Sequence, residues 1–303
     1  MVLEVLLVIL VFLAVALVAG NNLSACVGPA VGARIISKRT GAFLGLAGFS
    51  AGLIVQGSGM SKSVAILLPN PTIELQIAAL LSATVIFGIA HLARVPLSLS
   101  MSLVGLLTGL AFSQGITTSL TYLSQVVSMW FVAPTVAAII SFYMIRIINK
   151  RAVTNIWRRI RFYKALLIVF SFTTAFALGA NTLGLIVATA GFNLVTVAVA
   201  VGGILVGSFY LAEGSIRRMA QEFYLMRYSN AVVTLATSTI LVEIAAFLNI
   251  PLSNTQTTAA AVFGTGFSYK AKFMSVKPFI IIVAGWIIAP LLSFLIGWLI
   301  ILI

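Results

Sequence analysis

Long uninterrupted apolar stretches recur from one end of this sequence to the other, and they constrain the fold more than any other feature. A helix of about 20 apolar residues crosses the ~30 Å hydrocarbon core of a bilayer, whereas a membrane β-barrel shows short strands of alternating polarity. Of the 303 residues, 61% are hydrophobic and 8% are charged, which leaves too little polar surface for a soluble domain. The sequence therefore predicts an all-α polytopic membrane protein.

The hydrophobic segments number about ten to twelve, and re-entrant segments are compatible with the pattern. Residues 1–20 are expected to form the first membrane helix rather than a signal peptide, because their only charge is Glu4 and their apolar run is too long. The stretch 183–212 is too long for one span, so a break is expected near Gly191 or Gly202–Gly203. The candidate helices lie near residues 2–20, 40–57, 74–93, 97–114, 119–148, 164–180, 183–212, 230–249, 252–268 and 277–302.

Basic residues are concentrated in the middle of the chain, where residues 146–164 hold seven of the 18 lysines and arginines. By the positive-inside rule this segment faces the cytoplasm, and the net charge of +13 then reflects topology rather than a nucleic-acid partner. We expect an integral protein of the plasma membrane, and the sequence leaves open whether it forms a homodimer. The chain is expected to comprise a first membrane repeat at 1–148, a basic cytoplasmic linker at 149–163 and a second membrane repeat at 164–303.

The two halves share short motifs that recur in the same order, each at an offset close to half of the chain length. If each half crosses the membrane an odd number of times, the copies are inverted relative to one another, which is a common architecture of secondary transporters. The matching pairs are AGNNLSA (19–25) with GANTLGL (179–185), GLIVQGS (52–58) with GGILVGS (202–208), and ARVPLSLSMS (93–102) with LNIPLSNTQT (248–257).

A Gly/Asn-rich segment follows an apolar run in each half, at residues 20–32 and 179–184. Such residues are expected to break the helix, releasing backbone N–H groups and offering amides and hydroxyls. In hydrocarbon, irregular backbone of this kind is tolerated where it lines a cavity.

A proline followed by a hydroxyl cluster also occurs twice, at residues 96–102 and 251–258. Proline suits the first helical turn and Ser or Thr suits its cap. A half-helix that starts inside the membrane would point free N–H groups and the positive end of its dipole at an oxyanion. Ser and Thr in membrane helices also mediate packing or bond to their own backbone, but two symmetric clusters favour a site.

These segments resemble the motifs of the inorganic phosphate transporter family, which includes sulfate permeases. Its members carry two copies of G-A-N-D-V-A-N, similar to AGNNLSACVGPAVG and GANTLGLIVATAG, and copies of G-x-P-V-S-T-T-H, similar to VPLSLSMSLVG and IPLSNTQTTAA. The resemblance implies an inverted-repeat fold with a central anion site built from the signature Asn and the hydroxyl cluster. The candidate substrate-binding residues are Asn21, Asn22, Ser24, Ser98, Ser100, Asn181, Thr182, Ser253, Asn254 and Thr255.

The sequence departs from the family motifs at their acidic positions. The signature Asp falls at Asn22 and Thr182, and the motif His becomes Met101 and Gln256. The chain contains no aspartate, so it lacks the charged ligands that the family uses for sodium. Sodium coupling is therefore less expected than proton coupling or facilitated diffusion, and no cofactor or metal site is expected.

Glu243 is the candidate coupling group, because an ionisable side chain within an apolar run indicates a functional site. A structural hydrogen bond is the alternative role. Residues 48–52 match the G-x-S-x-G motif of hydrolases, but they lie inside an apolar helix and the chain has one His. We therefore interpret this match as a small-residue face for helix packing and not as the site of a hydrolase. We expect a secondary transporter, not an enzyme, that carries a small oxyanion, phosphate first and sulfate second, while an anion channel remains the rival.

Overall fold

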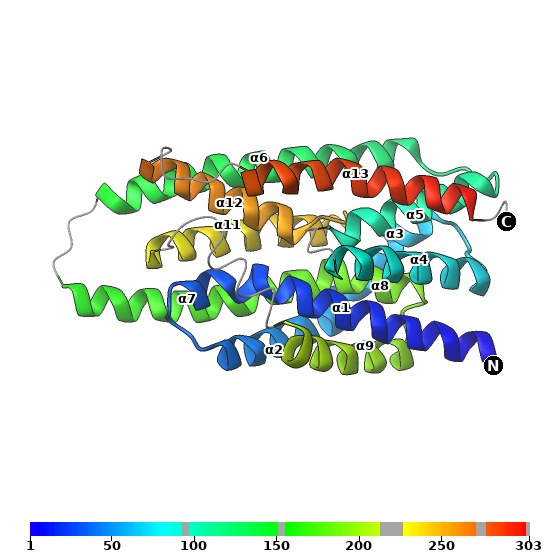
Figure 1. The fold of residues 1–303 in the computed structure, drawn as a ribbon, viewed down its shortest axis with the longest axis horizontal. Coiled ribbons are helices and arrows are strands. Elements are labelled where there is room, and N and C mark those ends of the chain that lie inside the picture. Colours follow the sequence, from blue (N-terminus) through cyan, green and yellow to red (C-terminus); the bar gives the residue numbers. More distant parts are fainter. Residues whose placement is uncertain (93–96, 151–154, 213–226, 271–276, 301–303) are drawn as a thin grey trace.

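The computed structural model describes residues 1–92, 97–150, 155–212, 227–270 and 277–300, and these residues form helices and contain no strand. The helices lie roughly along one axis, and both chain termini are at the same end of the molecule (Figure 1). The first half comprises α1 Val2–Gly32, α2 Lys38–Gln56, the 3₁₀ turn η1 Gly57–Gly59, α3 Met60–Leu67, α4 Ile73–Leu92, α5 Leu99–Ser113 and α6 Leu120–Lys150. The second half comprises α7 Ile156–Leu178, the π-helical turn η2 Gly179–Leu183, α8 Gly184–Thr189, α9 Leu194–Val206, the π-helical turn η3 Gly207–Leu211, α11 Tyr228–Phe247, α12 Asn254–Lys270 and α13 Lys277–Leu299.

Seven helical stretches among the described residues are long and apolar enough to cross a bilayer. This agrees with the expected all-helical membrane protein. Helix α5 is shorter, with 15 residues, and at about 1.5 Å per residue it falls short of the ~30 Å hydrocarbon core. Helix α5 is therefore too short to cross the core on its own.

The expected helix break after residue 20 is absent, so that prediction is wrong. Helix α1 continues through Asn21 and Asn22 to Gly32, with Pro29 inside it. The hydroxyl of Ser24 donates to the carbonyl of Asn21 at 2.8 Å, a bond within the helix. Because residues 22–30 are buried against neighbouring helices, packing sustains the helix where local propensity disfavours it.

The second copy of this motif also stays helical, but its geometry changes. Residues Gly179–Leu183 widen into a π-helical turn and the chain continues into α8, so this segment does not end the helix either. The predicted break near Gly191 is confirmed. Gly191 has φ +88°, a left-handed conformation that favours glycine, and Asn193 caps the start of α9 by accepting from the Thr196 N–H at 3.0 Å.

Glycines set the closest helix contacts. Helix α2 packs along α7, where Gly48 and Gly52 face the backbone of Phe172 and Phe176 with no room for a side chain. The residues of the G-x-S-x-G match therefore form a small-residue packing face, as predicted.

The same contact recurs between α1 and α9–η3, where Gly207 faces the carbonyl of Ala16. Two further helix contacts correspond to one another in the two halves, that of α5 with α13 and that of α12 with α6. Gly109 of α5 faces the carbonyl of Phe294, and Gly264 of α12 faces the carbonyl of Ala138. Helices of the first half thus pack mainly on helices of the second half, in corresponding pairs.

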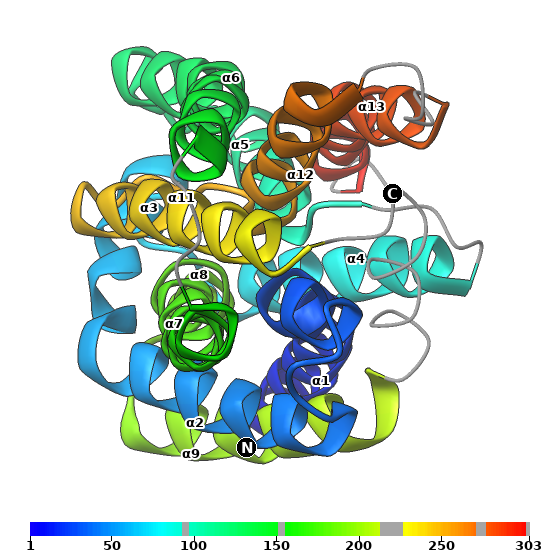
Figure 2. The ribbon, with the colours of Figure 1, turned by 90° about the vertical axis from the view of Figure 1, so that its left-hand side faces the viewer.

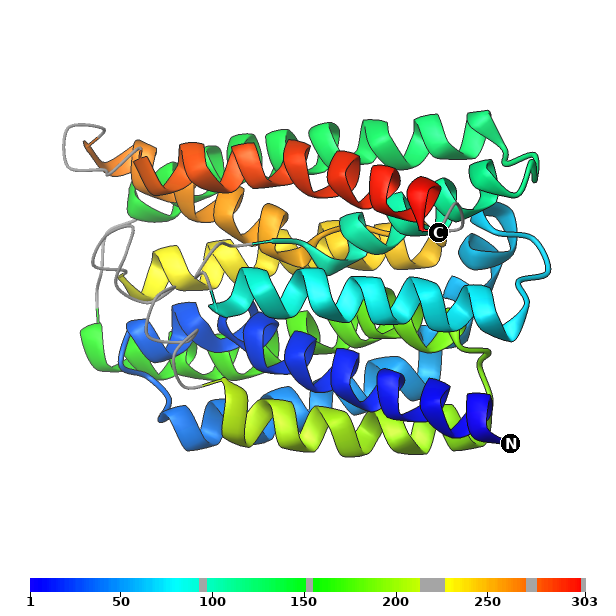
Figure 3. The same cartoon turned by 45° about the vertical axis from the view of Figure 1, so that its right-hand side comes forward.

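The arrangement places α5, α6, α12 and α13 on one side of the molecule and α2 and α9 on the other, with α1, α4, α7 and α11 between them (Figure 2). Helices α5 and α12 begin near the middle and run toward opposite ends (Figures 1 and 3). The two half-helices therefore start close together at the centre of the bundle. Helices α1 and α7 instead start at opposite ends of the bundle and run toward each other.

Candidate functional site

The first hydroxyl cluster caps the beginning of α5. Ser98 is the N-cap residue, and its Oγ accepts from the Met101 N–H at 3.5 Å. The hydroxyls of Ser98 and Ser100 lie 3.4 Å apart, and both residues are buried. The cap satisfies one N–H of the first turn.

The second cluster repeats this geometry at the beginning of α12, with every residue number increased by 155. Ser253 Oγ accepts from the Gln256 N–H at 3.4 Å and lies 2.9 Å from Thr255 Oγ1. Pro251 lies in the extended segment before the helix rather than in its first turn, which corrects the predicted placement of the proline. The serine, not the proline, marks the helix start, because only the serine side chain can accept from the first turn.

An extended segment, residues 249–253, separates α11 from α12 in the interior of the bundle. Asn249 turns the chain with φ +54°. Its carbonyl accepts hydrogen bonds from Ser63 Oγ of α3 and from the Tyr122 hydroxyl of α6, the latter at 2.6 Å. Non-helical backbone at membrane depth requires such partners, because no water is present in hydrocarbon to replace them.

The next three carbonyls of this segment are also paired with side chains from other helices. Asn181 Nδ2 donates to the carbonyl of Ile250 at 2.8 Å. Trp130 Nε1 donates to the carbonyl of Pro251 at 3.0 Å, and Ser100 Oγ donates to the carbonyl of Leu252 at 3.4 Å. Side chains of η2, α5 and α6 therefore fix the path by which the chain enters α12.

Asn181 makes two of the contacts that hold this segment. Its Oδ1 accepts from the Leu252 N–H at 3.0 Å while its Nδ2 bonds the carbonyl of Ile250. Asn181 is fully buried in the π-helical turn, and the neighbouring Thr182 is 1% exposed. Thus one amide bridges two backbone groups and joins the signature motif of the second half to the start of α12.

Asn254, the first residue of α12, faces away from this bridge. Its Oδ1 accepts from Ser238 Oγ of α11 at 2.9 Å, and its Nδ2 lies 3.6 Å from Cys26 Sγ of α1. Ser238 Oγ also lies 2.8 Å from the hydroxyls of both Thr257 and Thr258. The polar groups around Asn254 thus satisfy one another where α1, α11 and α12 meet.

The first-half signature residues lie on α1, one turn before Cys26. Asn22 is 6% exposed, and its Oδ1 accepts from Asn21 Nδ2 at 3.4 Å. Ser24 is buried and bonds within its own helix. By the repeat offset of 155, residues 95–97 correspond to residues 250–252, and residues 95 and 96 lie outside the described residues.

The structure therefore brings five predicted residues together around one backbone segment. The five are Ser98, Ser100, Asn181, Ser253 and Thr255. The other five lie on helix α1, in the π-helical turn η2 and on the other side of α12. Sequence reasoning missed Ser63, Tyr122 and Trp130, whose side chains bond the same segment. No motif marks them, and a Trp or Tyr within an apolar run signals only that its polar atom needs a partner.

Glu243 lies on α11, apart from these residues, with its side chain beside that of Gln56 at the end of α2. Its Oε2 atom is buried without a hydrogen-bond partner among the described residues, and so is Nε2 of Gln56. The described residues contain no group of three or more His, Cys, Asp or Glu side chains that could hold a metal ion.

The sequence profile of the phosphate transporter family matches the chain twice, at residues 18–162 and 152–297. A candidate phosphate permease of Methanocaldococcus jannaschii is 24% identical over 281 residues, covering 92% of this chain and 91% of that protein. A sulfate permease of Bacillus subtilis is 25% identical over 299 residues, covering 94% of this chain and 83% of the permease.

The fold is also that of a solved structure. A sodium-dependent phosphate transporter superposes with a TM-score of 0.87 at 18% identity, and each chain covers 100% of the other. These matches confirm the resemblance drawn from the motifs, since the profile spans nearly all of the sequence. The chain therefore belongs to the phosphate transporter family.

Proposed function

We propose that this chain is a secondary transporter that moves phosphate across the plasma membrane through a site where α5 and α12 begin. The single observation that carries the proposal is the meeting of two serine-capped half-helices, linked by the bond from Ser100 to the carbonyl of Leu252. Sulfate is the alternative substrate, which the similarity to a sulfate permease favours.

The anion would be held by hydroxyls and helix N-termini rather than by a fixed positive charge. A helix start offers N–H groups and about half a positive charge, which suits an oxyanion. Ser98, Ser100, Ser253 and Thr255 supply hydroxyls that can donate to its oxygens. Asn181 shapes this site through the backbone of residues 250–252. Asn21, Asn22, Ser24, Thr182 and Asn254 complete the proposed lining.

The two halves, residues 1–148 and 164–303, are proposed to be inverted repeats joined by the basic segment 149–163. Three observations support this. The family profile matches twice in succession, α5 and α12 run in opposite directions from the centre (Figure 1), and the glycine contacts occur in matched pairs. An inverted repeat gives two equivalent half-sites that face opposite sides of the membrane, as alternating access requires.

Coupling is proposed to use protons rather than sodium. The chain has no aspartate, and neutral oxygens bind a hard cation less strongly than carboxylates do. Glu243 is the group we assign to the proton, because it is ionisable, lies within a membrane helix and has an unpaired buried oxygen.

Uptake by purified protein in proteoliposomes tests this function. Radiolabelled phosphate and sulfate are supplied separately under a sodium gradient, a proton gradient or neither. We expect saturable phosphate uptake that is stimulated by an inward proton gradient and is insensitive to sodium. The absence of uptake of both anions under every gradient would overturn the proposal.

The same vesicles distinguish a carrier from a channel. A carrier shows counterflow, in which unlabelled phosphate inside accelerates entry of the label, because the loaded site returns faster than the empty one. An anion channel, whose pore stays open to both sides, shows no such acceleration and passes unitary currents in a planar bilayer.

A further inference from the structure

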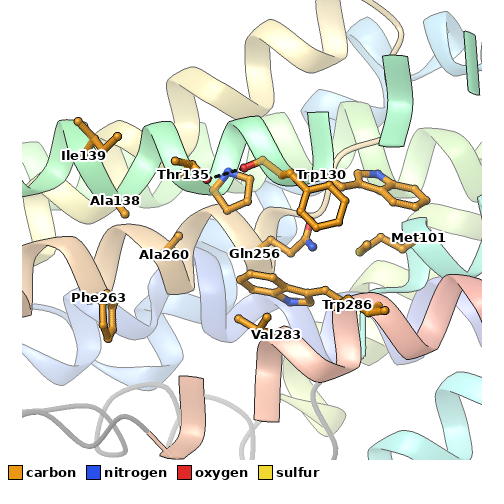
Figure 4. A pocket seen from close by; sticks show the side chains of 13 residues that line it. Met101, Trp130, Thr135, Ala138, Ile139, Gln256, Ala260, Phe263, Val283 and Trp286 are labelled. Atoms are coloured by element: carbon orange, nitrogen blue, oxygen red, sulfur yellow. Dashed lines mark hydrogen bonds between the residues drawn. The ribbon is translucent and has the colours of Figure 1, made fainter. Parts of the chain in front are cut away.

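A cavity of about 350 Å³ lies between α6, α12 and α13, beside the starts of α5 and α12. Figure 4 shows the rings of Trp130 and Trp286 on either side of it, with Gln256 between them. Apart from Gln256 and Thr135, the side chains around the cavity are apolar. Met101 also lines it, so both positions at which the family motif has His face the same space.

The cavity opens toward the lipid-facing surface of the protein. Three lining residues are strongly exposed: Phe131 at 60%, Ile139 at 52% and Ile287 at 47%. All three belong to helices α6 and α13, which lie at the outside of the bundle (Figure 2). A ligand would therefore enter from the bilayer rather than from water.

Gln256 places an unsatisfied amide at this apolar cavity. The residue is fully buried, and neither Nε2 nor Oε1 has a hydrogen-bond partner among the residues that the structure describes. A buried amide without partners is costly, so a ligand that both donates and accepts gains from binding there. The amide therefore selects for a polar end that can do both.

An un-ionised carboxyl group matches a primary amide in both respects. Its C=O accepts from Nε2–H while its O–H donates to Oε1, which forms a ring of two hydrogen bonds. An ionised carboxylate lacks the donor and would lose its solvation in an apolar cavity. An ester lacks the donor, and a hydrocarbon chain lacks both groups.

We propose that this cavity binds a single-chain fatty acid from the bilayer, with its un-ionised carboxyl group paired to the Gln256 amide and its chain lying toward Phe131, Ile139 and Ile287. The chemistry rests on the cavity and its amide alone and does not depend on which anion the protein moves. A bound acid would occupy the gap between α12 and the outer helices α6 and α13.

Photolabelling tests the proposal on the full chain in lipid nanodiscs. The probe is palmitic acid with a diazirine in its chain, and the labelled peptides are identified by mass spectrometry. We expect labelling on α6, α12 and α13 that excess palmitic acid and hexadecanol displace, whereas methyl palmitate displaces it at least tenfold less well. Equal displacement by methyl palmitate would overturn the paired hydrogen bonds.

Two variants test whether labelling depends on the Gln256 amide and the cavity or only on general contact with lipid. Gln256→Leu removes no side-chain hydrogen bond within the described part of the chain, so the fold should persist while displaceable labelling falls at least tenfold. Ile139→Trp, at the exposed mouth, should reduce labelling by obstruction. Val85→Leu, on the lipid-facing side of α4, is the matched control and should label normally. Undiminished labelling of Gln256→Leu, or labelling that excess palmitic acid does not displace, would overturn the proposal.

Discussion

At the scale of single residues, Asn181 connects the signature motif of the second half to the start of α12. Its amide bonds one backbone acceptor and one backbone donor of residues 250–252. Ser63, Tyr122, Trp130 and Ser100 satisfy the other carbonyls of that segment. The extended backbone is stable at this depth because each carbonyl from residue 249 to 252 has a donor.

Asn181→Ala should destabilise the protein as well as reduce uptake. It leaves the carbonyl of Ile250 and the N–H of Leu252 unpaired, and each orphaned group costs about 1–3 kcal/mol. Thermal unfolding in detergent measures the loss, with Ser124→Ala, which removes an exposed hydroxyl bonded within α6, as the control. Loss of uptake at unchanged stability would show that Asn181 contacts only the anion.

Glu243→Gln should abolish the stimulation of uptake by a proton gradient while leaving uptake without a gradient measurable. Glutamine keeps the shape and hydrogen bonding of the protonated carboxyl group but cannot release a proton. Uptake at several external pH values measures the effect. Glu74→Gln, in the exposed first turn of α4, serves as the control, and an unchanged proton response in Glu243→Gln would remove that residue as the coupling group.

At the scale of elements, hydrophobic length and the two capping serines predicted most helices and the starts of α5 and α12. The break near Gly191 was also predictable, because glycine favours the left-handed turn found there and nothing lies within 4 Å of its Cβ position. The Asn-rich segments were predicted wrongly as helix ends. Tertiary packing around α1 and the π-helical turn at Asn181 keep them helical, and such packing leaves no local signal in the sequence.

The bridge to residues 250–252 was likewise hidden from the sequence. Asn181 and Ile250 are 69 residues apart, and Trp130 and Pro251 are 121 apart. The motifs identified which residues are special but not that several of them bind backbone. Only the fold shows that Asn181 and Ser100 each contact the segment that leads into α12.

Gly52→Ala and Gly207→Ala should each destabilise the protein by about 1–3 kcal/mol, the usual cost of overpacking. Each added methyl group would meet the backbone of the facing helix, at Phe176 and Ala16 respectively. Gly88→Ala is the control, because nothing lies within 4 Å of its Cβ position, and it should be neutral or slightly stabilising. Unfolding in detergent compares the three, and a neutral Gly52→Ala would contradict the close contact.

At the scale of the whole molecule, one end of the bundle collects positive charge. The end of α1, the starts of α2 and α7 and the end of α6 lie together there (Figure 3). These helix ends and the turn after α1 carry Arg34, Lys38, Arg39, Arg146, Lys150, Arg158, Arg159 and Arg161. By the positive-inside rule we propose that this end faces the cytoplasm.

Cysteine labelling tests this orientation in intact cells. Lys150→Cys should resist a membrane-impermeant maleimide until the cells are opened, whereas Thr117→Cys, just before the opposite end of α6, should react at once. The native Cys26 is fully buried, so it should give little background. Reaction of Lys150→Cys in intact cells would reverse the assigned topology.

The central claim is that both half-helices contribute to one anion site. Equilibrium dialysis of radiolabelled phosphate against the purified protein tests it most directly, using Ser98→Ala/Ser100→Ala, Ser253→Ala/Thr255→Ala and the control Thr108→Ala, whose hydroxyl bonds within α5. We predict one phosphate per chain, with binding lost in both double variants and kept in the control. Two phosphates per chain, with each double variant retaining one, would contradict the account.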